Sequence, residues 1–196
     1  MPQSSDAGLH DAKTGLRARA RMIRNRIAPA LPNAGEQIRD RILHDIALPE
    51  TAVISGYWPI GTELDIRPFL FAWHNAGRTS TLPVVIARQH PLTFRHWTPE
   101  TQLSPGPFKI LQPTDANPLI VPDVLIVPLL AFDRTGHRLG YGGAYYDLTI
   151  AERRASNAIL AIGVGFSGQE IDAIPFTAQD QRLDWIVTEQ FSLKIS

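Results

Sequence analysis

The sequence predicts one α/β domain built on an open, mostly parallel β-sheet of Rossmann-like type, with helices on both faces. Three observations predict it. Stretches with apolar residues at helical spacing alternate with short apolar runs, which is typical of β-α-β units. The run "DVLIVPLLAF" at residues 123–132 is apolar almost throughout, as expected of a central strand covered on both faces. A length of 196 residues suits one core better than two.

Composition narrows the function before any motif is considered. Nineteen basic and nineteen acidic residues cancel, so we expect neither nucleic acid nor a membrane as a partner. The lack of cysteine excludes disulfides, thiolate catalysis and cysteine-ligated zinc. The basic amino terminus lacks the apolar core of a signal peptide, and no apolar run is long enough to span a membrane. We expect a cytoplasmic protein, with residues 1–10 flexible and residues 11–196 as its single domain.

Two helices are expected before the first strand. The first carries apolar residues at helical spacing up to the Ala-Pro pair at 28–29, and basic side chains occupy most of its remaining circumference. The second spans residues 34–48. Asn33 and Glu36 form an N-x-x-E capping signal at its start, and Pro49 ends it.

The middle of the chain alternates between strand and helix patterns. Residues 51–58 ("TAVISGYW") have the composition of a buried strand. A third helix fits residues 65–77 and ends at a glycine, and residues 79–87 form the next strand. Polar and apolar residues alternate over 92–97 ("LTFRHW"), which favours an antiparallel or edge strand.

The remaining elements follow the apolar run at 123–132. A helix is expected to begin near Gly143 and to continue through "AYYDLTIAERRA". Residues 158–166 ("AILAIGVGF") form a further central strand, and residues 184–189 ("DWIVTE") form the last one.

The stretch "RLGYGGAYYD" at residues 138–147 lies between the central strand and the following helix. In open α/β sheets ligands bind there, where carboxyl ends of strands meet amino ends of helices. Its glycines let backbone N–H groups approach a ligand, and the helix dipole favours an anion such as phosphate. Arg138 can bridge phosphate oxygens, Asp147 can bind Mg²⁺, and the tyrosines offer amphipathic walls to a flat ligand. The motif alone is weak, because such turns also occur for purely geometric reasons.

Several motifs in order make the assignment more specific. "FDRTGHRLGYGGAYYD" resembles the signature of 5-formyltetrahydrofolate cyclo-ligases, also called 5,10-methenyltetrahydrofolate synthetases. The family's K-x-x-L-R motif is matched by residues 13–17, and its Y-x-P…E strand end by "YWPIGTE". "LTFRHWTPETQLSPGPFKILQP", "VGFSGQE" and "DQRLDWIVTE" follow in the family's order. The resemblance covers residues from about 11 to 190.

The resemblance implies a fold and a reaction. Cyclo-ligases fold as a single α/β domain, on a sheet similar to that of sugar-phosphate isomerases and acyl-CoA transferases. They convert 5-formyltetrahydrofolate and ATP, with Mg²⁺, into 5,10-methenyltetrahydrofolate, ADP and phosphate. The formyl oxygen is phosphorylated and N10 then closes the ring. We therefore expect 5-formyltetrahydrofolate and ATP as partners, Mg²⁺ as the cofactor, and a monomer.

The resemblance also assigns roles to residues of this chain. The catalytic residues are Arg138 and Tyr145, and the magnesium ligands are Asp147 and Asp180. Asp133 is expected to order its loop rather than bind metal. Binding of ATP falls to Lys13, Arg17, Arg138, Leu139, Gly140, Tyr141, Gly142, Gly143, Ala144, Tyr145 and Tyr146. Binding of the folate substrate falls to Arg17, Trp58, Glu63, Tyr141, Gly142, Gly143, Ala144 and Tyr145.

Other polar and aromatic residues have simpler interpretations. The histidines lack zinc-site spacing, and Ser167 in "GFSGQE" lacks the surroundings of a hydrolase nucleophile. Tryptophans other than Trp58 are expected in the core or at its rim. The first helix has four further arginines that are expected to form a solvated face, namely Arg19, Arg21, Arg24 and Arg26.

Three departures from the family pattern leave alternatives open. The family commonly has glycine where Ala144 stands, and the methyl group would crowd the phosphate loop or exclude a positive φ there. Gln112 replaces an expected glutamate, and Leu148 replaces a usually basic residue. A catalytically altered paralogue that binds folate or another small substrate in a regulatory role is therefore one alternative. A sugar-phosphate isomerase or acyl-CoA transferase on a similar sheet is another alternative. Activity that does not depend on magnesium would distinguish it from a cyclo-ligase.

Overall fold

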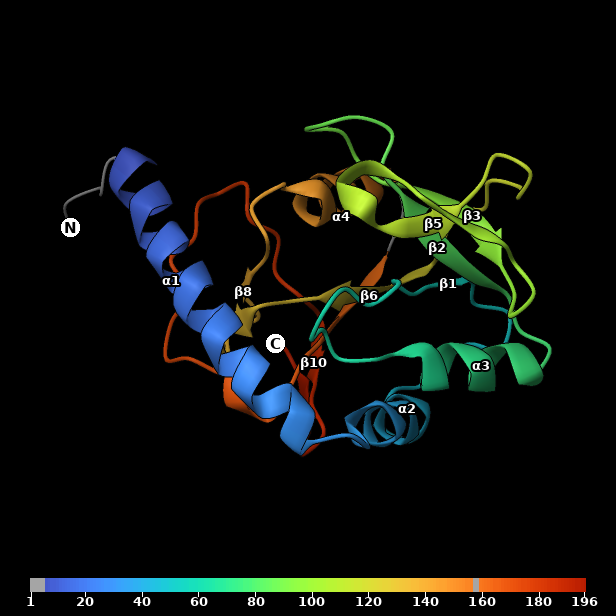
Figure 1. The fold of residues 1–196 in the computed structure, drawn as a ribbon, viewed down its shortest axis with the longest axis horizontal. Helices are drawn as coiled ribbons and strands as arrows, with labels where there is room; N and C mark the ends of the chain where they lie inside the picture. Colours follow the sequence, from blue (N-terminus) through green and yellow to red (C-terminus); the bar gives the residue numbers. More distant parts are fainter. Residues whose placement is uncertain (1–5, 157–158) are drawn as a thin grey trace.

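The computed structural model describes residues 6–156 and 159–196 and is built around a seven-stranded sheet (Figure 1). Its strand order is β11-β10-β9-β6-β1-β2-β3. The five inner strands are parallel, whereas β3 and β11 pair antiparallel at the two edges. The bounds are β1 Ile54–Ser55, β2 Ser80–Val84, β3 Thr93–Trp97, β6 Val124–Pro128, β9 Leu160–Val164, β10 Trp185–Val187 and β11 Ser192–Lys194.

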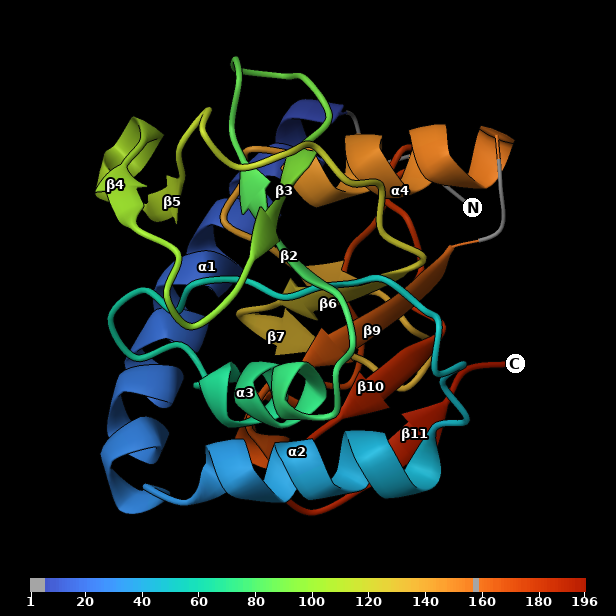
Figure 2. The same cartoon turned by 90° about the vertical axis from the view of Figure 1, so that its right-hand side faces the viewer.

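Helices cover both faces of this sheet. Helices α2 (Ala34–Asp45) and α3 (Arg67–Asn75) pack on one face, and α4 (Tyr145–Ser156) packs on the other (Figures 1 and 2). A core cluster that includes Ile38 and Trp73 fills the first layer. A second cluster that includes Ile150 fills the layer under α4. The predicted fold class is confirmed.

Helix α1 (Asp6–Ile27) lies outside these layers, beside β8 (Figure 1). Its Ala20 side chain packs with Leu130, Leu139 and Ile174 in a third, smaller cluster. Three 3-10 helices complete the helical elements, namely η1 Ala28–Ala30, η2 Pro107–Lys109 and η3 Ser167–Gln169.

The order of the parallel strands defines a ligand-binding edge. From β1 the chain goes outward to β2 on one side and then returns to β6 on the other side of β1. This reversal is a topological switch point, and ligands of open α/β sheets bind outside the carboxyl ends of the strands at such a point. The segments that follow β1 and β6 are therefore placed to form a site.

The helix boundaries differ from the predicted ones in identifiable ways. Helix α1 begins at Asp6 and so includes residues 6–10, while residues 1–5 lie outside the described part of the chain. Helix α2 ends at Asp45, before residue 48, because the backbone of Ile46 is extended. Asn33 is at the N-cap of α2, but its side chain makes no capping hydrogen bond.

The end of α3 follows the prediction closely. Gly77 has φ +73°, the left-handed conformation that favours glycine. Its N–H donates to the carbonyl of His74, and the N–H of Arg78 donates to that of Trp73. These two bonds form a Schellman motif, which satisfies carbonyls that the helix end would leave unpaired.

The run at 123–132 is two strands rather than one. Strand β6 ends at Pro128 in the sheet, and β7 (Ala131–Phe132) instead pairs antiparallel with β8 (Arg138–Leu139). Proline has no N–H for a further ladder bond, so the chain leaves the sheet there. Burial continues across the break, and the sequence therefore gives no sign of it.

The other predicted strands exist but are shorter. Strand β1 has two residues within 51–58, β2 lies within 79–87, and β10 lies within 184–189. Strand β9 lies within 158–166, of which residue 158 falls outside the described part. The edge position of β3 is confirmed. The prediction missed β11 and a hairpin of β4 (Leu103–Pro105) with β5 (Leu111–Pro113).

Candidate active site

The glycine-rich turn joins β8 to α4 and stands at the carboxyl edge of the sheet. Residues 140–144 connect Leu139 to Tyr145, the first residue of α4. Gly142 has φ +98°, a conformation that side chains rarely adopt. An added Cβ at Gly142 would lie 3.3 Å from Cζ of Arg17, so glycine also permits close packing against α1. The predicted turn before a helix is confirmed, although a hairpin rather than the central strand precedes it.

Ala144 has a positive φ, although its methyl group was expected to crowd the phosphate loop or exclude that conformation. Its φ is +56°, so an alanine methyl group does not prevent the left-handed turn, although it adds strain. Ala144 is exposed, and its carbonyl accepts the N–H of Leu148 to open α4.

Two cations of α1 contact the turn and the segment before β10. Nζ of Lys13 lies 2.7 Å from both carboxylate oxygens of Asp180. Nε of Arg17 donates to the carbonyl of Gly140 at 2.9 Å. Burial lowers the pKa of Arg17, the charge of Arg21 adds to the lowering, and the charge of Asp180 opposes it. Helix α1 therefore places one positive charge on the predicted phosphate loop and a second on Asp180.

Arg138 is a buried cation behind the same loop. Its guanidinium donates to Oδ1 of Asp147 at 2.8 Å and to the carbonyl of Gln181 at 2.6 Å. The N–H of Gln181 also donates to Oδ1 of Asp147. Asp180 precedes Gln181 in the chain and therefore lies in the same region. Burial lowers the pKa of Arg138, while the charges of Asp147 and Asp180 raise it. Both predicted metal ligands thus lie beside predicted phosphate-binding cations.

Glu63 is a buried carboxylate on the loop that follows β1. Its Oε2 accepts the N–H of Ile60 at 2.8 Å, and the hydroxyl of Tyr141 hydrogen-bonds to the carboxylate. Burial raises the pKa of Glu63, and the hydrogen bonds of Tyr141 and Ile60 and the charge of Arg24 oppose that rise. The turn and the loop after β1 therefore meet at the switch point, as the topology requires.

The expectation that Arg24 lies on a solvated face is wrong. Arg24 is 6% exposed, whereas Arg19, Arg21 and Arg26 are exposed. The spacing of residues along α1 indicates that Arg24 faces the protein. Lys13, Arg17, Ala20 and Arg24 are spaced four, three and four residues apart, so all four share one face of α1.

The remaining aromatic residues are distributed around the site. Trp58, on the loop that also carries Glu63, stacks at a tilt on Trp97 with centroids 6.4 Å apart, and Arg67 lies over its ring. Tyr145 and Tyr146 are half-buried at the start of α4 and pack against the core under that helix. Burial and the charge of Glu63 raise the pKa of Tyr146, and the charge of Arg138 opposes them.

Asp133 and Gln112 have contacts that order loops. Both oxygens of Asp133 accept hydrogen bonds, which come from Thr135, from the His137 N–H and from the Ile174 N–H. Oε1 of Gln112 accepts the N–H of Val85 at 3.3 Å, which ties β5 to the segment after β2. The neutral amide thus makes a structural contact at the position of the expected glutamate.

The carboxylates suit a magnesium ion that is shared with a nucleotide. Mg²⁺ usually takes one or two protein carboxylates, and phosphate oxygens and water complete its shell. The predicted ligands Asp147 and Asp180 are carboxylates of the required type, and each is paired with a cation, Arg138 and Lys13 respectively. Within residues 6–156 and 159–196, no group of three His, Cys, Asp or Glu side chains is arranged to bind a metal, so phosphate and water would have to supply the other ligands.

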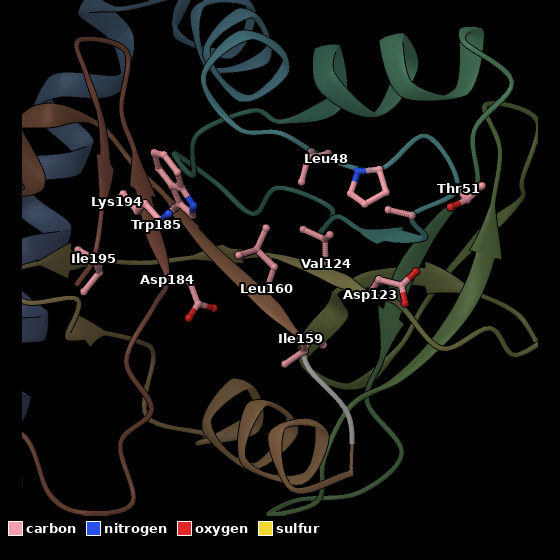
Figure 3. Close-up of a pocket in the computed structure, with 12 residues that line it drawn as sticks. Leu48, Thr51, Asp123, Val124, Ile159, Leu160, Asp184, Trp185, Lys194 and Ile195 are labelled. Carbon is pink, nitrogen blue, oxygen red and sulfur yellow. The ribbon is translucent and has the colours of Figure 1, made fainter.

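A separate groove of about 650 Å³ opens at the opposite edge of the sheet. Figure 3 shows Val124, Leu160 and Trp185 in it, the first residues of β6, β9 and β10. The groove therefore lies at the amino ends of the parallel strands, away from the glycine-rich turn. Its lining residues include none of the predicted site residues.

Comparisons with known proteins agree on one family. A model of the 5-formyltetrahydrofolate cyclo-ligase family matches residues 10–189. The 5-formyltetrahydrofolate cyclo-ligase of Escherichia coli (strain K12) is 30% identical over 180 residues, which cover 85% of this chain and 96% of that protein. That of Haemophilus influenzae is 26% identical, over 82% of this chain and 88% of its own.

Solved structures give the same result. The NMR structure of Aquifex aeolicus 5,10-methenyltetrahydrofolate synthetase matches with a TM-score of 0.72 and 27% identity, over 93% of this chain and 92% of that one. The Mycoplasma pneumoniae 5,10-methenyltetrahydrofolate synthetase shares the fold, with a TM-score of 0.71, 20% identity and coverage of 90% and 98%. Because the family model and the E. coli protein both match most of its length, the chain belongs to the 5-formyltetrahydrofolate cyclo-ligase family of enzymes.

Proposed function

We propose that the site at the switch point converts 5-formyltetrahydrofolate and ATP into 5,10-methenyltetrahydrofolate, ADP and phosphate. One observation carries the proposal. Of three cations, Arg17 contacts the glycine-rich turn, whereas Lys13 and Arg138 contact the carboxylates Asp180 and Asp147. A triphosphate needs this combination of backbone N–H groups and positive charges.

The chemistry explains why a nucleotide is needed. The formyl oxygen of the substrate belongs to an amide and is a poor leaving group. That oxygen attacks the γ-phosphorus of ATP, and the bond to the β-γ bridging oxygen breaks to release ADP. N10 then adds to the activated formyl carbon and loses its proton, and the carbon–oxygen bond breaks with loss of phosphate. The protein's main tasks are to align the reactants and to neutralise charge.

The cations of the site are arranged for that neutralisation. Arg138 is fixed by Asp147 and the Gln181 carbonyl, so its guanidinium has little freedom before a ligand binds. Lys13 and Arg17 approach from α1 on the other side of the turn. Charges fixed in advance stabilise a transition state without costly rearrangement.

Asp147 and Asp180 would hold Mg²⁺, which supplies charge neutralisation at the phosphate oxygens. Both carboxylates pair with cations in the ligand-free protein. With Asp147 and Asp180 as its ligands, the metal would share these carboxylates with Arg138 and Lys13, which would stay beside the phosphates.

The folate ring fits the other side of the turn. An ionised Glu63 can accept two N–H bonds from the amino-pyrimidinone edge of a pterin. Tyr141, Tyr145 and Trp58 provide aromatic surface on the adjoining walls, and Tyr145 is placed at the start of α4 between the two ligands. We propose further that the enzyme is monomeric and acts in the cytoplasm.

The test is formation of methenyltetrahydrofolate, followed by its near-ultraviolet absorbance, from (6S)-5-formyltetrahydrofolate with ATP and Mg²⁺. The expected result is product only when all three are present, with one ADP formed per product. Product without magnesium would contradict the metal assignment. Folded protein that binds ATP but forms no product would contradict the proposed reaction. Size-exclusion chromatography with light scattering tests the monomer.

A further inference from the structure

Arg24 is a buried charge at the contact between two parts of the site. Its Nε donates to Oγ1 of Thr62 at 3.2 Å, and its Nη1 donates to the hydroxyl of Tyr141. The same Nη1 lies 3.9 Å from Oε1 of Glu63. Side-chain exposures of 7% for Arg24 and 4% for Glu63 leave little solvent to screen this pair.

The partners of Arg24 come from segments far apart in sequence. Thr62 and Glu63 belong to the loop after β1, whereas Tyr141 belongs to the glycine-rich turn. The hydrogen bonds run in one direction, from the Arg24 guanidinium to the Tyr141 oxygen and from the Tyr141 hydroxyl to Glu63. Arg24 thereby links the loop that carries Glu63 to the glycine-rich turn that Arg17 also contacts.

The charge of Arg24 favours the carboxylate form of Glu63, together with the hydrogen bonds from Tyr141 and Ile60. The titratable and charged groups that face its carboxylate are Arg24 from α1, Tyr141 from the turn, Tyr57 from its own loop and Tyr146 from α4. Among these four, Arg24 is the cation. Burial raises the pKa of Glu63, and the charge of Arg24 counteracts that rise. Without it the carboxyl group gains a proton at a higher pH.

We propose that Arg24 is a positioning residue of the reaction, which maintains Glu63 as a carboxylate for the folate ring and connects it through Tyr141 to the nucleotide loop. The inference rests on the proposed function, because that function places the pterin at Glu63. A protonated Glu63 loses one of its two acceptor oxygens to the proton, and the folate then binds more weakly. Arg24 need not touch either substrate.

The experiment compares Arg24→Met and Arg24→Gln, which remove the charge, with Arg24→Lys, which retains it. Arg19→Met is the matched control, because it makes the same change at an exposed position of α1. For each folded variant, kcat and the KM for 5-formyltetrahydrofolate are measured between pH 5.5 and 9. The fold is checked by circular dichroism, and binding of 5-formyltetrahydrofolate is measured by quenching of tryptophan fluorescence.

The charge-removing variants should raise the folate KM about tenfold at neutral pH and change kcat much less, since a positioning residue acts on binding. The acid limb of the pH profile of kcat/KM should move to higher pH in these variants. Their loss of kcat/KM relative to the wild type should therefore shrink as pH rises. Arg24→Lys should restore the wild-type limb in part, and Arg19→Met should match the wild type. A limb that stays in place in a folded charge-removing variant would overturn the proposal, even with a raised KM.

The proposed function and this inference fail in different ways. If the wild type makes no product, the reaction is wrong. The fluorescence measurement still decides on Arg24, because binding should weaken toward low pH in Arg24→Gln more than in the wild type. If the wild type is active and binding responds to pH alike in both, the role of Arg24 is wrong and the reaction stands.

Discussion

Ala144 has a left-handed backbone conformation that glycine adopts more easily. Its φ of +56° lies in the left-handed region, which costs an L residue with a Cβ roughly 1 kcal/mol. The residue is exposed, so its methyl group contributes little packing in return. The conformation comes from the turn around it, where Gly142 also has a positive φ.

The first prediction follows from that strain. Ala144→Gly should raise the free energy of unfolding by about 0.5–1 kcal/mol, which corresponds to a Tm increase of about 2 °C. Urea unfolding measures it, with Ala18→Gly as the control, since an exposed glycine inside α1 should lower stability instead. If both substitutions are destabilising, the turn does not strain Ala144.

Asp147 and Trp185 lie at opposite edges of the sheet, so substitutions of these two residues test which edge carries the site. Asp147 accepts hydrogen bonds from Arg138 and from the Gln181 N–H at the carboxyl edge. Trp185 lines the groove at the amino edge. We predict that Asp147→Asn lowers magnesium-ATP turnover about 100-fold or more without unfolding the protein, because its amide oxygen can still accept a hydrogen bond but attracts a cation weakly.

Trp185→Phe is the comparison for that prediction, and it should retain turnover to within a few-fold. Steady-state kinetics at saturating folate, with magnesium varied, measures both variants. Equal losses in two folded variants would count against the metal role of Asp147.

At the residue scale, the sequence pattern selected polar residues that the fold brings together, but not how deeply each is buried. Arg17 contacts Gly140 of the turn, and Arg138 pairs with Asp147. Arg24 was missed because a charged residue in a basic helix usually faces water. Its burial depends on Glu63 and Tyr141, which are distant in sequence and meet it only in the folded protein.

Helix α1 is the element whose position depends most on the site. Its site contacts are polar and are spread along its length, with Lys13 on Asp180, Arg17 on Gly140 and Arg24 on Tyr141. Helix α2, in contrast, buries Ile38 and Ile42 completely in the core. A ligand that replaces the partners of Lys13 and Arg17 should therefore change the stability of α1 more than that of α2.

Hydrogen–deuterium exchange tests this difference. We predict that a non-hydrolysable ATP analogue with Mg²⁺ slows amide exchange in α1 around Lys13 and Arg17 and leaves α2 unchanged, because new phosphate contacts reduce local opening of α1. The analogue without magnesium should give weaker protection. Equal slowing in both helices would indicate a global effect of binding and would contradict a specific role of α1.

At the element scale, periodicity predicted which elements exist, whereas their bounds needed the three-dimensional structure. The helices α2 and α3 and the strands β2, β3, β6 and β9 lie where the pattern placed them. The separation of β6 from β7 was missed because both are buried and apolar, and only hydrogen-bond pairing distinguishes them. The edge strand β11 was missed because its sequence, Ser-Leu-Lys, contains one apolar residue and therefore shows no strand pattern.

At the scale of the whole molecule, the strand order explains why distant motifs form one site. The loop after β1 and the segment after β6 leave the sheet at its switch point and contact each other through Tyr141 and Glu63. A sequence pattern gives the order of strands along the chain but not their order across the sheet.

Asp133 joins two parts of this molecule and should influence its stability in acid. It binds the turn between β7 and β8 through Thr135 and His137, and the carboxy-terminal part through Ile174. Burial alone would raise the pKa of Asp133, but these hydrogen bonds outweigh burial and lower it. An acid whose pKa is lower in the folded state stabilises the protein above its unfolded pKa of about 3.9, and this stability is lost as pH falls through the folded value.

We therefore predict that Asp133→Asn lowers the free energy of unfolding by about 2 kcal/mol at pH 7, because the amide nitrogen cannot accept one set of these bonds. The difference from the wild type should shrink as pH falls below about 4, where the wild-type carboxylate also gains its proton. Urea unfolding between pH 2.5 and 7 measures this, with the exposed Asp172→Asn as the control. A difference that stays constant with pH would mean that Asp133 contributes through shape and not through charge. The pKa of Asp133 would then have to be the same in the folded and unfolded states, although three backbone N–H groups donate to its oxygens in the folded protein.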